Sequence, residues 1–173
     1  MKNKFITLSY ITICVLIITT LHACKKEPDA TGIDKQLFDM AIETTGFTWY
    51  KNSSALLDKS PGSGHSELLL RTRYNSVASA VLDINGKIIP GSIFPEGSLV
   101  VKELYNNSTD IDRYAILYKK SSDANADAAG WVWGYINADE TVAEEASNKG
   151  SACRGCHSQT NNIDLNLMNV YFP

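Results

Sequence analysis

Hydrophobic and polar positions first indicate a helix near the start of the globular part of the chain. Gly46 ends a segment, residues 33–45, in which apolar residues recur at helical spacing. These apolar residues are Ile33, Leu37, Met40 and Ala41. Residues 49–66 then look irregular around a cluster of Ser, Pro and Gly. The pattern therefore predicts one helix followed by a long loop.

Short runs of β-branched and aromatic residues dominate the middle of the chain. Residues 67–74 favour a strand, and three stronger strand signals follow. These signals lie at residues 98–105, 113–119 and 131–136. Polar turns separate them, as in an antiparallel meander. With further helical segments expected at residues 76–82 and 140–148, the fold class is α+β, mainly an antiparallel β-sheet with flanking helices.

The first residues have the pattern of an export signal. Lys2 and Lys4 precede an apolar run at residues 5–21, whose length and flanks fit a secretory signal better than a spanning helix. Leu21 lies three positions before Cys24, as in a bacterial lipobox. We expect lipidation of Cys24, with an uncleaved anchor and plain secretion as the alternatives. All three place the domain outside the cytoplasm, and the first places it on a bacterial membrane, at the periplasmic face or the outer membrane.

The chain divides into a signal peptide at residues 1–23, a tether at residues 24–32 and one domain at residues 33–173. A length of 173 residues suits one compact domain better than two. The formal net charge is −3 and no basic block stands out, so a nucleic-acid partner is not expected.

Cysteine usage is the most informative part of the composition. Of four cysteines, Cys14 lies in the signal and Cys24 at the lipidation site, which leaves Cys153 and Cys156 in the domain. Two cysteines so close together make no disulfide framework. A four-thiolate zinc site is excluded for the same domain, because only two thiols exist.

The two domain cysteines belong to a C-x-x-C-H run near the C-terminus, which is the attachment motif of haem c. Thiols at this spacing can add to the two vinyl groups of one haem, and His157 can then ligate the iron from below the ring. The alternatives are a thioredoxin-like dithiol or half of a metal site. A redox C-x-x-C normally opens a helix after a first strand, and none is predicted just before Cys153. We therefore expect one covalently attached haem c on Cys153, Cys156 and His157.

The sixth iron ligand is the next question. The domain offers His65, Met40 and Met168. Met40 lies on an apolar helix face and Met168 only 11 positions after His157, so packing is favoured for both. His65 follows a Gly and Ser loop, which favours a surface or structural role. The expectation is an open distal site, whose polarity decides what happens to a bound small molecule.

Several local runs resemble the cytochrome P-460 family and its cytochrome c′-beta relatives. Residues 94–103, FPEGSLVVKE, are similar to the family's F-P-[DE]-G-T-x-x-x-K-E run. His65 with residues 71–75, the aromatic strand at residues 130–135, and Asp164 extend the similarity. The resemblance covers most of the domain. It implies a mainly antiparallel sheet, a haem against that sheet and a homodimer.

The resemblance also assigns roles to two residues. Lys102 matches a lysine that P-460 proteins link covalently to the haem edge, whereas the c′-beta branch has no link. By period two, Lys102 shares a strand face with Val100 and Leu104, where an amine is costly unless paired or consumed. The alternative is that Lys102 faces solvent, with Glu103 on the other face. Arg71 matches a distal arginine that could hydrogen-bond to a bound ligand, with a surface ion pair as the alternative.

Other positions bear on the distal side. Phe47 and Phe94 could wall it, although core packing is favoured for both. Hydroxylamine-oxidising members carry a carboxylate shortly before the haem motif, and residues 148–152 here contain no acid. Glu144 and Glu145 lie further back, where a solvated helix face is favoured. This departure weakens the case for hydroxylamine oxidation.

The sequence thus predicts an exported, lipid-anchored, mono-haem c-type protein. Its open distal site would bind nitric oxide or hydroxylamine, or change their redox state, with Arg71 and Lys102 as catalytic candidates. Whether turnover occurs stays open. One alternative is a six-coordinate electron-transfer cytochrome, and another is a nitric oxide scavenger or sensor. The expected partners are a redox protein or a small nitrogen-oxide ligand, and the membrane through the lipid.

Overall fold

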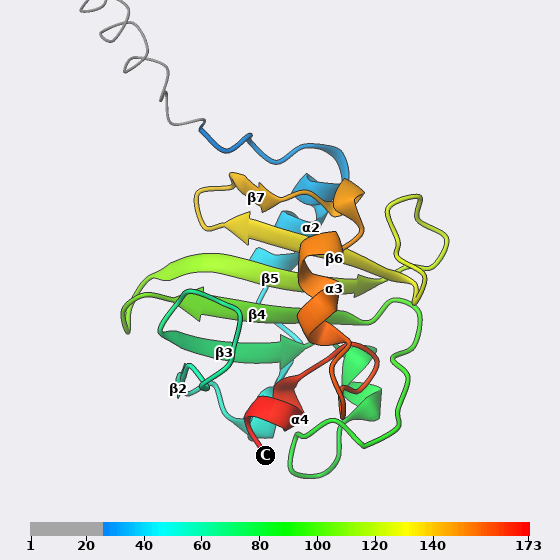
Figure 1. Ribbon diagram of the computed structural model, residues 1–173. Coiled ribbons are helices and arrows are strands. Elements are labelled where there is room, and N and C mark those ends of the chain that lie inside the picture. The colour runs from blue at the N-terminus through cyan, green and yellow to red at the C-terminus, as the bar shows by residue number, and fades with distance from the viewer. Residues whose placement is uncertain (1–25) are drawn as a thin grey trace, which may run out of the picture.

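The computed structural model describes residues 26–173, which build one antiparallel sheet (Figure 1). Its strands are β1 (Thr48–Trp49), β2 (Leu57–Asp58), β3 (Leu69–Tyr74), β4 (Leu99–Tyr105), β5 (Ile111–Lys119), β6 (Trp131–Asn137) and β7 (Val142–Glu144). They lie in the order β1, β3, β4, β5, β6, β7, and β2 pairs with β3 beside β1. Every pairing is antiparallel. The α+β class and the meander of β4, β5 and β6 are therefore confirmed.

The predicted signal peptide and Cys24 lie outside the described residues. Within residues 26–173, no helix has the length and apolarity needed to cross a membrane.

Short helices cover both faces of the sheet. They are α2 (Gly32–Ile42), α3 (Ser151–His157) and α4 (Met168–Tyr171), with 3-10 turns η2 (Tyr50–Asn52), η3 (Ala78–Val81) and η4 (Ala146–Asn148). Figure 1 shows α2 behind the sheet and α3 in front of it. The expected first helix is confirmed, although it ends at Ile42 rather than at residue 45. Its buried residues are Leu37, Phe38 and Ala41.

Alternation along the strands sorts side chains between these two faces. On β4, Leu99 and Val101 belong to the cluster that packs under α2. Val100 and Leu104 belong to the cluster on the opposite face. We call this opposite face the pocket face. Because successive side chains of a strand point to opposite faces, Lys102 lies on the pocket face with Val100 and Leu104.

One predicted helix is wrong, and another is confirmed only as a short 3-10 helix. The segment expected to be helical at residues 140–148 forms β7 and then the 3-10 turn η4. Pairing with β6 provides the reason, since Tyr135 pairs with Glu144 and Ile136 with Val142. A free sheet edge thus outweighed the local helical preference. Residues 76–82 form only the short η3 turn.

Asp164 ties the chain after the haem motif to the sheet. Its carboxylate accepts hydrogen bonds from Lys119 Nζ at 2.9 Å, from Trp131 Nε1 at 3.2 Å and from the Phe94 backbone N–H at 3.0 Å. Phe94 in turn stacks on Tyr74 and is 1% exposed. These contacts join the 94–103 segment to the C-terminal segment, so both parts of the sequence resemblance meet at one buried carboxylate.

Candidate functional site

Helix α3 presents the two thiols and the imidazole to one pocket. Cys153 and His157 are four residues apart, so they lie on one helix face, and Cys156 lies one turn from Cys153. All three side chains line a cavity of about 400 Å³ on the pocket face of the sheet. Cys153 is half-buried and Cys156 exposed, and both thiols are free. Burial raises the pKa of the Cys153 thiol.

The start of α3 is locked against the sheet through Trp133. Gly150, with φ +66°, caps the helix, and a Cβ built there would lie 2.5–2.7 Å from three atoms of the Trp133 ring. The Trp133 indole donates to Asp127 Oδ2 at 2.9 Å. Arg154 of α3 lies 3.6 Å from the same oxygen. This close approach places the helix where its thiols meet the pocket.

The His157 imidazole is fixed by a hydrogen bond to the backbone and by an aromatic contact. Its Nδ1 lies 2.7 Å from the Leu165 carbonyl oxygen, so Nδ1 carries the proton and donates it. The Trp133 ring meets the imidazole edge-on, with ring centroids 5.1 Å apart. Burial lowers the pKa of His157 to about 4, which keeps the ring neutral. The hydrogen bonds among residues 26–173 leave Nε2 without a partner, and its lone pair is free for a metal.

The opposite wall of the pocket is a row of side chains that crosses the sheet. Antiparallel register aligns Thr72 with Lys102, Lys102 with Ala115, Ala115 with Tyr135 and Tyr135 with Glu144. All five residues line the pocket. The small Ala115 leaves a gap between the amine and the phenol. Lys102 is half-buried, and desolvation lowers its pKa to about 8.

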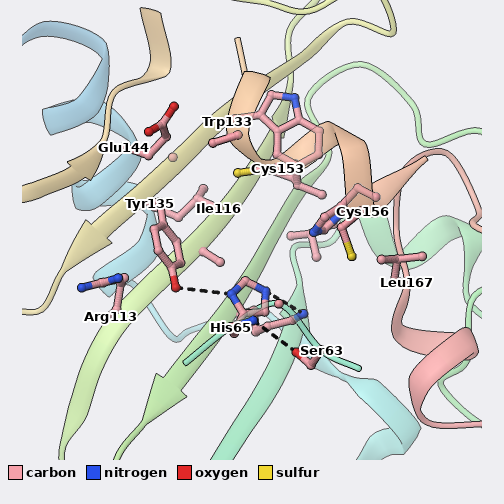
Figure 2. Close-up of a pocket in the computed structure, with 18 of the residues that line it drawn as sticks. Ser63, His65, Arg113, Ile116, Trp133, Tyr135, Glu144, Cys153, Cys156 and Leu167 are labelled. Atoms are coloured by element: carbon pink, nitrogen blue, oxygen red, sulfur yellow. Dashed lines mark hydrogen bonds between the residues drawn. The ribbon is translucent and has the colours of Figure 1, made fainter. Parts of the chain in front are cut away.

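His65 fills that gap from a separate loop. Its Nε2 lies 3.5 Å from Lys102 Nζ, and its Nδ1 lies 3.4 Å from Tyr135 Oη. Figure 2 shows the imidazole pointing toward Tyr135, with the two cysteine sulfurs on the α3 side of the pocket. Desolvation, followed by the charge of Lys102, lowers the pKa of His65 to about 2. Of the surface or structural role expected for His65, the surface position is wrong, because His65 is half-buried and part of the pocket wall.

Arg71 is not in this pocket, which corrects the expectation of a distal arginine. It pairs across strands with Glu103, on the face opposite to Lys102, because the two strand positions differ by one. Its guanidinium bonds the Glu103 carboxylate and stacks 4.6 Å from the Trp49 ring centroid. Arg73 bonds the same carboxylate at 2.9 Å. The alternative of an ion pair describes Arg71, and its partner Glu103 is buried.

Two polar residues that the sequence did not single out, Arg113 and Tyr135, line the pocket together with Glu144, for which the sequence favours a solvated helix face. Arg113 lines it from β5, with its guanidinium carbon 4.6 Å from the centroid of the Tyr135 ring. Tyr135 comes from β6. Glu144 lines it from β7 instead of lying on a solvated helix face, whereas Glu145 is exposed. Alternation within β5 and β6 could have grouped Arg113 and Tyr135 with their own strand neighbours. It could not have supplied the register that joins them to Lys102.

The remaining candidates for the distal side are committed to other contacts. Met40 packs with the cluster under α2, on the far face of the sheet. Met168 lines the pocket, is 2% exposed and accepts a hydrogen bond from Thr72 Oγ1 at 3.2 Å on its sulfur. Phe94 is buried in the core and Phe47 packs under the Arg73 guanidinium, as favoured from the sequence. None of these four side chains is a free ligand facing His157.

The pocket fits a haem. It offers two free thiols at the right spacing and an imidazole whose Nδ1 is already bonded and whose Nε2 is available. Its central walls are apolar, formed by Val100, Ala115, Leu117 and Trp133. Among residues 26–173, no group of three or more His, Cys, Asp or Glu side chains is arranged to hold a bare metal ion.

A mainly antiparallel sheet with a C-x-x-C-H helix packed over an apolar pocket defines a β-sheet protein with a haem-type site. Comparison with protein families agrees, since the model described as Cytochrome P460 matches residues 74–166. The match spans more than half of the chain, and the chain belongs to the cytochrome P460 family. It is therefore a haem cytochrome. A search of curated proteins found no match.

Proposed function

We propose that the protein is an exported, mono-haem c-type cytochrome with an open distal site for a small nitrogen-oxide ligand, nitric oxide or hydroxylamine. Cys153 and Cys156 would hold the haem through thioether bonds, and His157 Nε2 would ligate its iron. When bound, the haem supplies an iron that cycles between two oxidation states and can take a small ligand in its sixth position.

The arrangement of α3 supports the covalent attachment. Gly150 and Trp133 fix where the helix begins, so the two thiols are presented to the pocket together. The Leu165 carbonyl fixes the proton of His157 on Nδ1, which makes Nε2 the more basic ligand atom. Removal of this acceptor would let the imidazole turn and change tautomer.

One observation supports the open distal site. Each side chain that could act as a sixth iron ligand makes other contacts. Met40 lies across the sheet, and Met168 accepts the Thr72 hydroxyl proton. His65 bridges Lys102 and Tyr135. An electron carrier would use one of these groups as a strong sixth ligand.

The polar wall supports a ligand that takes part in proton chemistry. Lys102, Arg113 and Tyr135 line the same apolar cavity, and each can donate a hydrogen bond to an oxygen or nitrogen of a bound molecule. In a cavity that excludes water such donors act more strongly than they would in solvent. Arg113 therefore takes the hydrogen-bonding role toward a bound ligand that the sequence analysis gave to Arg71. A carboxylate is also at hand in Glu144, although it comes from β7 rather than from the residues just before the haem motif.

An absorption spectrum of the reduced protein, made with the cytochrome c maturation machinery, tests the proposal. Covalent haem staining in denaturing gels, abolished by joint Cys153→Ala and Cys156→Ala substitution, is expected. A broad five-coordinate spectrum that changes on addition of nitric oxide supports the open site. Sharp, split visible bands without a response to nitric oxide would instead define a six-coordinate electron carrier. A strongly red-shifted main band would mean that Lys102 is linked to the haem edge.

We also propose that the export signal and lipidation of Cys24 hold the domain at a bacterial membrane, outside the cytoplasm. The support is the lipobox-like run before Cys24 and the need of c-type haem attachment for export. Metabolic labelling with a palmitate analogue, lost in Cys24→Ala, tests it.

A further inference from the structure

His65 occupies an unusual position between two groups that exchange protons. Its Nε2 faces the Lys102 amine at 3.5 Å and its Nδ1 faces the Tyr135 phenol at 3.4 Å. Both contacts are longer than an ordinary hydrogen bond, and a shift of a few tenths of an ångström closes them. Such lengths are common in sites that hold no ligand. The alignment of Lys102, Ala115 and Tyr135 explains the geometry, because Ala115 leaves room for the imidazole between its neighbours.

A neutral imidazole in this position has two tautomers, in which the hydrogen bonds to Lys102 and Tyr135 run in opposite directions. When Lys102 is an ammonium it donates to Nε2, and the Nδ1 proton of His65 points to Tyr135. When Lys102 is a neutral amine, Nε2 carries the proton and donates to Lys102, and Nδ1 accepts from the Tyr135 hydroxyl. The two arrangements are linked by moving one proton at each end of the ring. His65 can thus pass a proton without becoming charged.

We propose that His65 is a proton-relay residue that carries a proton from Tyr135 to Lys102 after Lys102 has given one to a ligand in the pocket. The Nε2 proton moves to Lys102 Nζ while the Tyr135 hydroxyl proton moves to Nδ1. Lys102 is again an ammonium, the imidazole stays neutral, and the Tyr135 phenolate takes a proton from solvent. To reset the tautomer, Nδ1 releases its proton to water and Nε2 takes one from water, so the imidazole is neutral again. The role of the relay, though not its existence, rests on the proposed function.

Arg113 makes the Tyr135 end of the relay workable. Burial raises the pKa of Tyr135, and the Arg113 guanidinium, whose carbon lies 4.6 Å from the Tyr135 ring centroid, offsets part of this effect by stabilising a transient phenolate. The Arg113 side chain is 22% exposed, so solvent reaches this end of the pocket. On its far side Arg113 lies 3.8 Å from Glu67, a buried carboxylate.

Other titratable groups share the cavity with these three residues. They are Glu27, Glu144, Cys153, Cys156, His157 and Tyr171, in addition to Arg113. Desolvation of the Lys102 amine opposes its ammonium form and lowers its pKa to about 8. Burial likewise lowers the pKa of His65, which keeps the ring neutral in both arrangements.

Exchange of the Lys102 ammonium protons with water measures the relay directly. The full-length protein is labelled with ¹⁵N-lysine and studied by NMR in its reduced, carbon monoxide-bound form, which is diamagnetic. The Lys102 signal is assigned by its loss in Lys102→Met. His65→Gln is the matched variant, because glutamine keeps a donor and an acceptor near Lys102 but cannot change tautomer. Tyr135→Phe removes the proton source and keeps the ring.

Both variants are expected to slow the exchange of the Lys102 protons at least tenfold at pH 6, while the pKa of Lys102 stays within about one unit. A purely structural His65 would be replaced by glutamine without slowing exchange. An unchanged exchange rate in either variant overturns the relay. So does a Lys102 that is linked to haem and shows no free ammonium. Haem staining of the same samples tests the proposed function separately, and a haem-free protein, which is diamagnetic without carbon monoxide, would still report on the relay through the same exchange measurement.

Discussion

Substitution of Gly150 by alanine tests the placement of the haem-motif helix. Gly150 has φ +66°, a conformation that costs an alanine about 1–2 kcal/mol. Its new Cβ would also lie 2.5–2.7 Å from three atoms of the Trp133 ring, about 0.8 Å or more inside a normal carbon contact. Overpacking of this kind costs about 1–3 kcal/mol. The ring cannot move freely, because its indole N–H is bonded to Asp127.

The matched control is Gly46→Ala. Gly46 has φ +77° and nothing within 4 Å of its new Cβ, so this variant carries only the backbone cost. We expect Gly150→Ala to lower the free energy of unfolding by about 2–5 kcal/mol and Gly46→Ala by about 1–2 kcal/mol. For a domain of this size, about 2–4 °C of melting temperature corresponds to each kcal/mol.

Thermal unfolding followed by circular dichroism, with haem content determined from the same samples, provides the assay. Gly150→Ala should melt clearly below Gly46→Ala and carry less covalent haem, because α3 must shift to relieve the contact. Equal melting temperatures for the two variants would refute the tight approach of Gly150 to Trp133. The anchoring of α3 through that contact would then be wrong.

Two further predictions concern buried charge. Glu103→Gln should lower the free energy of unfolding by about 3–5 kcal/mol in urea titrations, because it leaves Arg73, which is 0% exposed, without a counter-charge. The exposed Glu145→Gln is its control and should change stability little; a similar loss in both would contradict the reasoning. His65 has a pKa of about 2 when folded and 6.5 as its ordinary value, so the unfolded chain binds the extra proton between these values. Stability should therefore fall as the pH drops below about 6.5, by at most about 1.4 kcal/mol per pH unit from this residue. His65→Gln should flatten that slope, and an unchanged slope would exclude a neutral, buried His65.

Local sequence patterns predicted the elements whose residues carry a clear signal within the segment itself. The three runs of β-branched and aromatic residues became β4, β5 and β6, and the spaced apolar residues near the start became α2. The helix predicted at residues 140–148 is wrong, because part of this segment pairs with the edge of β6 instead of forming helical turns with its own neighbours. A pattern within one segment carries no information on such a partner.

The sequence by itself determined the chemistry of the site and the face of Lys102. Spacing within a few residues placed two thiols and an imidazole on one short helix, and period-two alternation placed Lys102 opposite Glu103. Strand register was decided only by the tertiary structure. That register set Lys102, Ala115 and Tyr135 in one row and moved Arg71 to the far face.

The tertiary structure alone also decided where the loop places His65 relative to this row. The position of His65 depends on its contacts with Lys102, 37 positions later in the chain, and with Tyr135, 70 positions later. The physical reason is that side-chain direction repeats locally along a strand, whereas the neighbours it meets are fixed by long-range pairing and by burial over the whole domain.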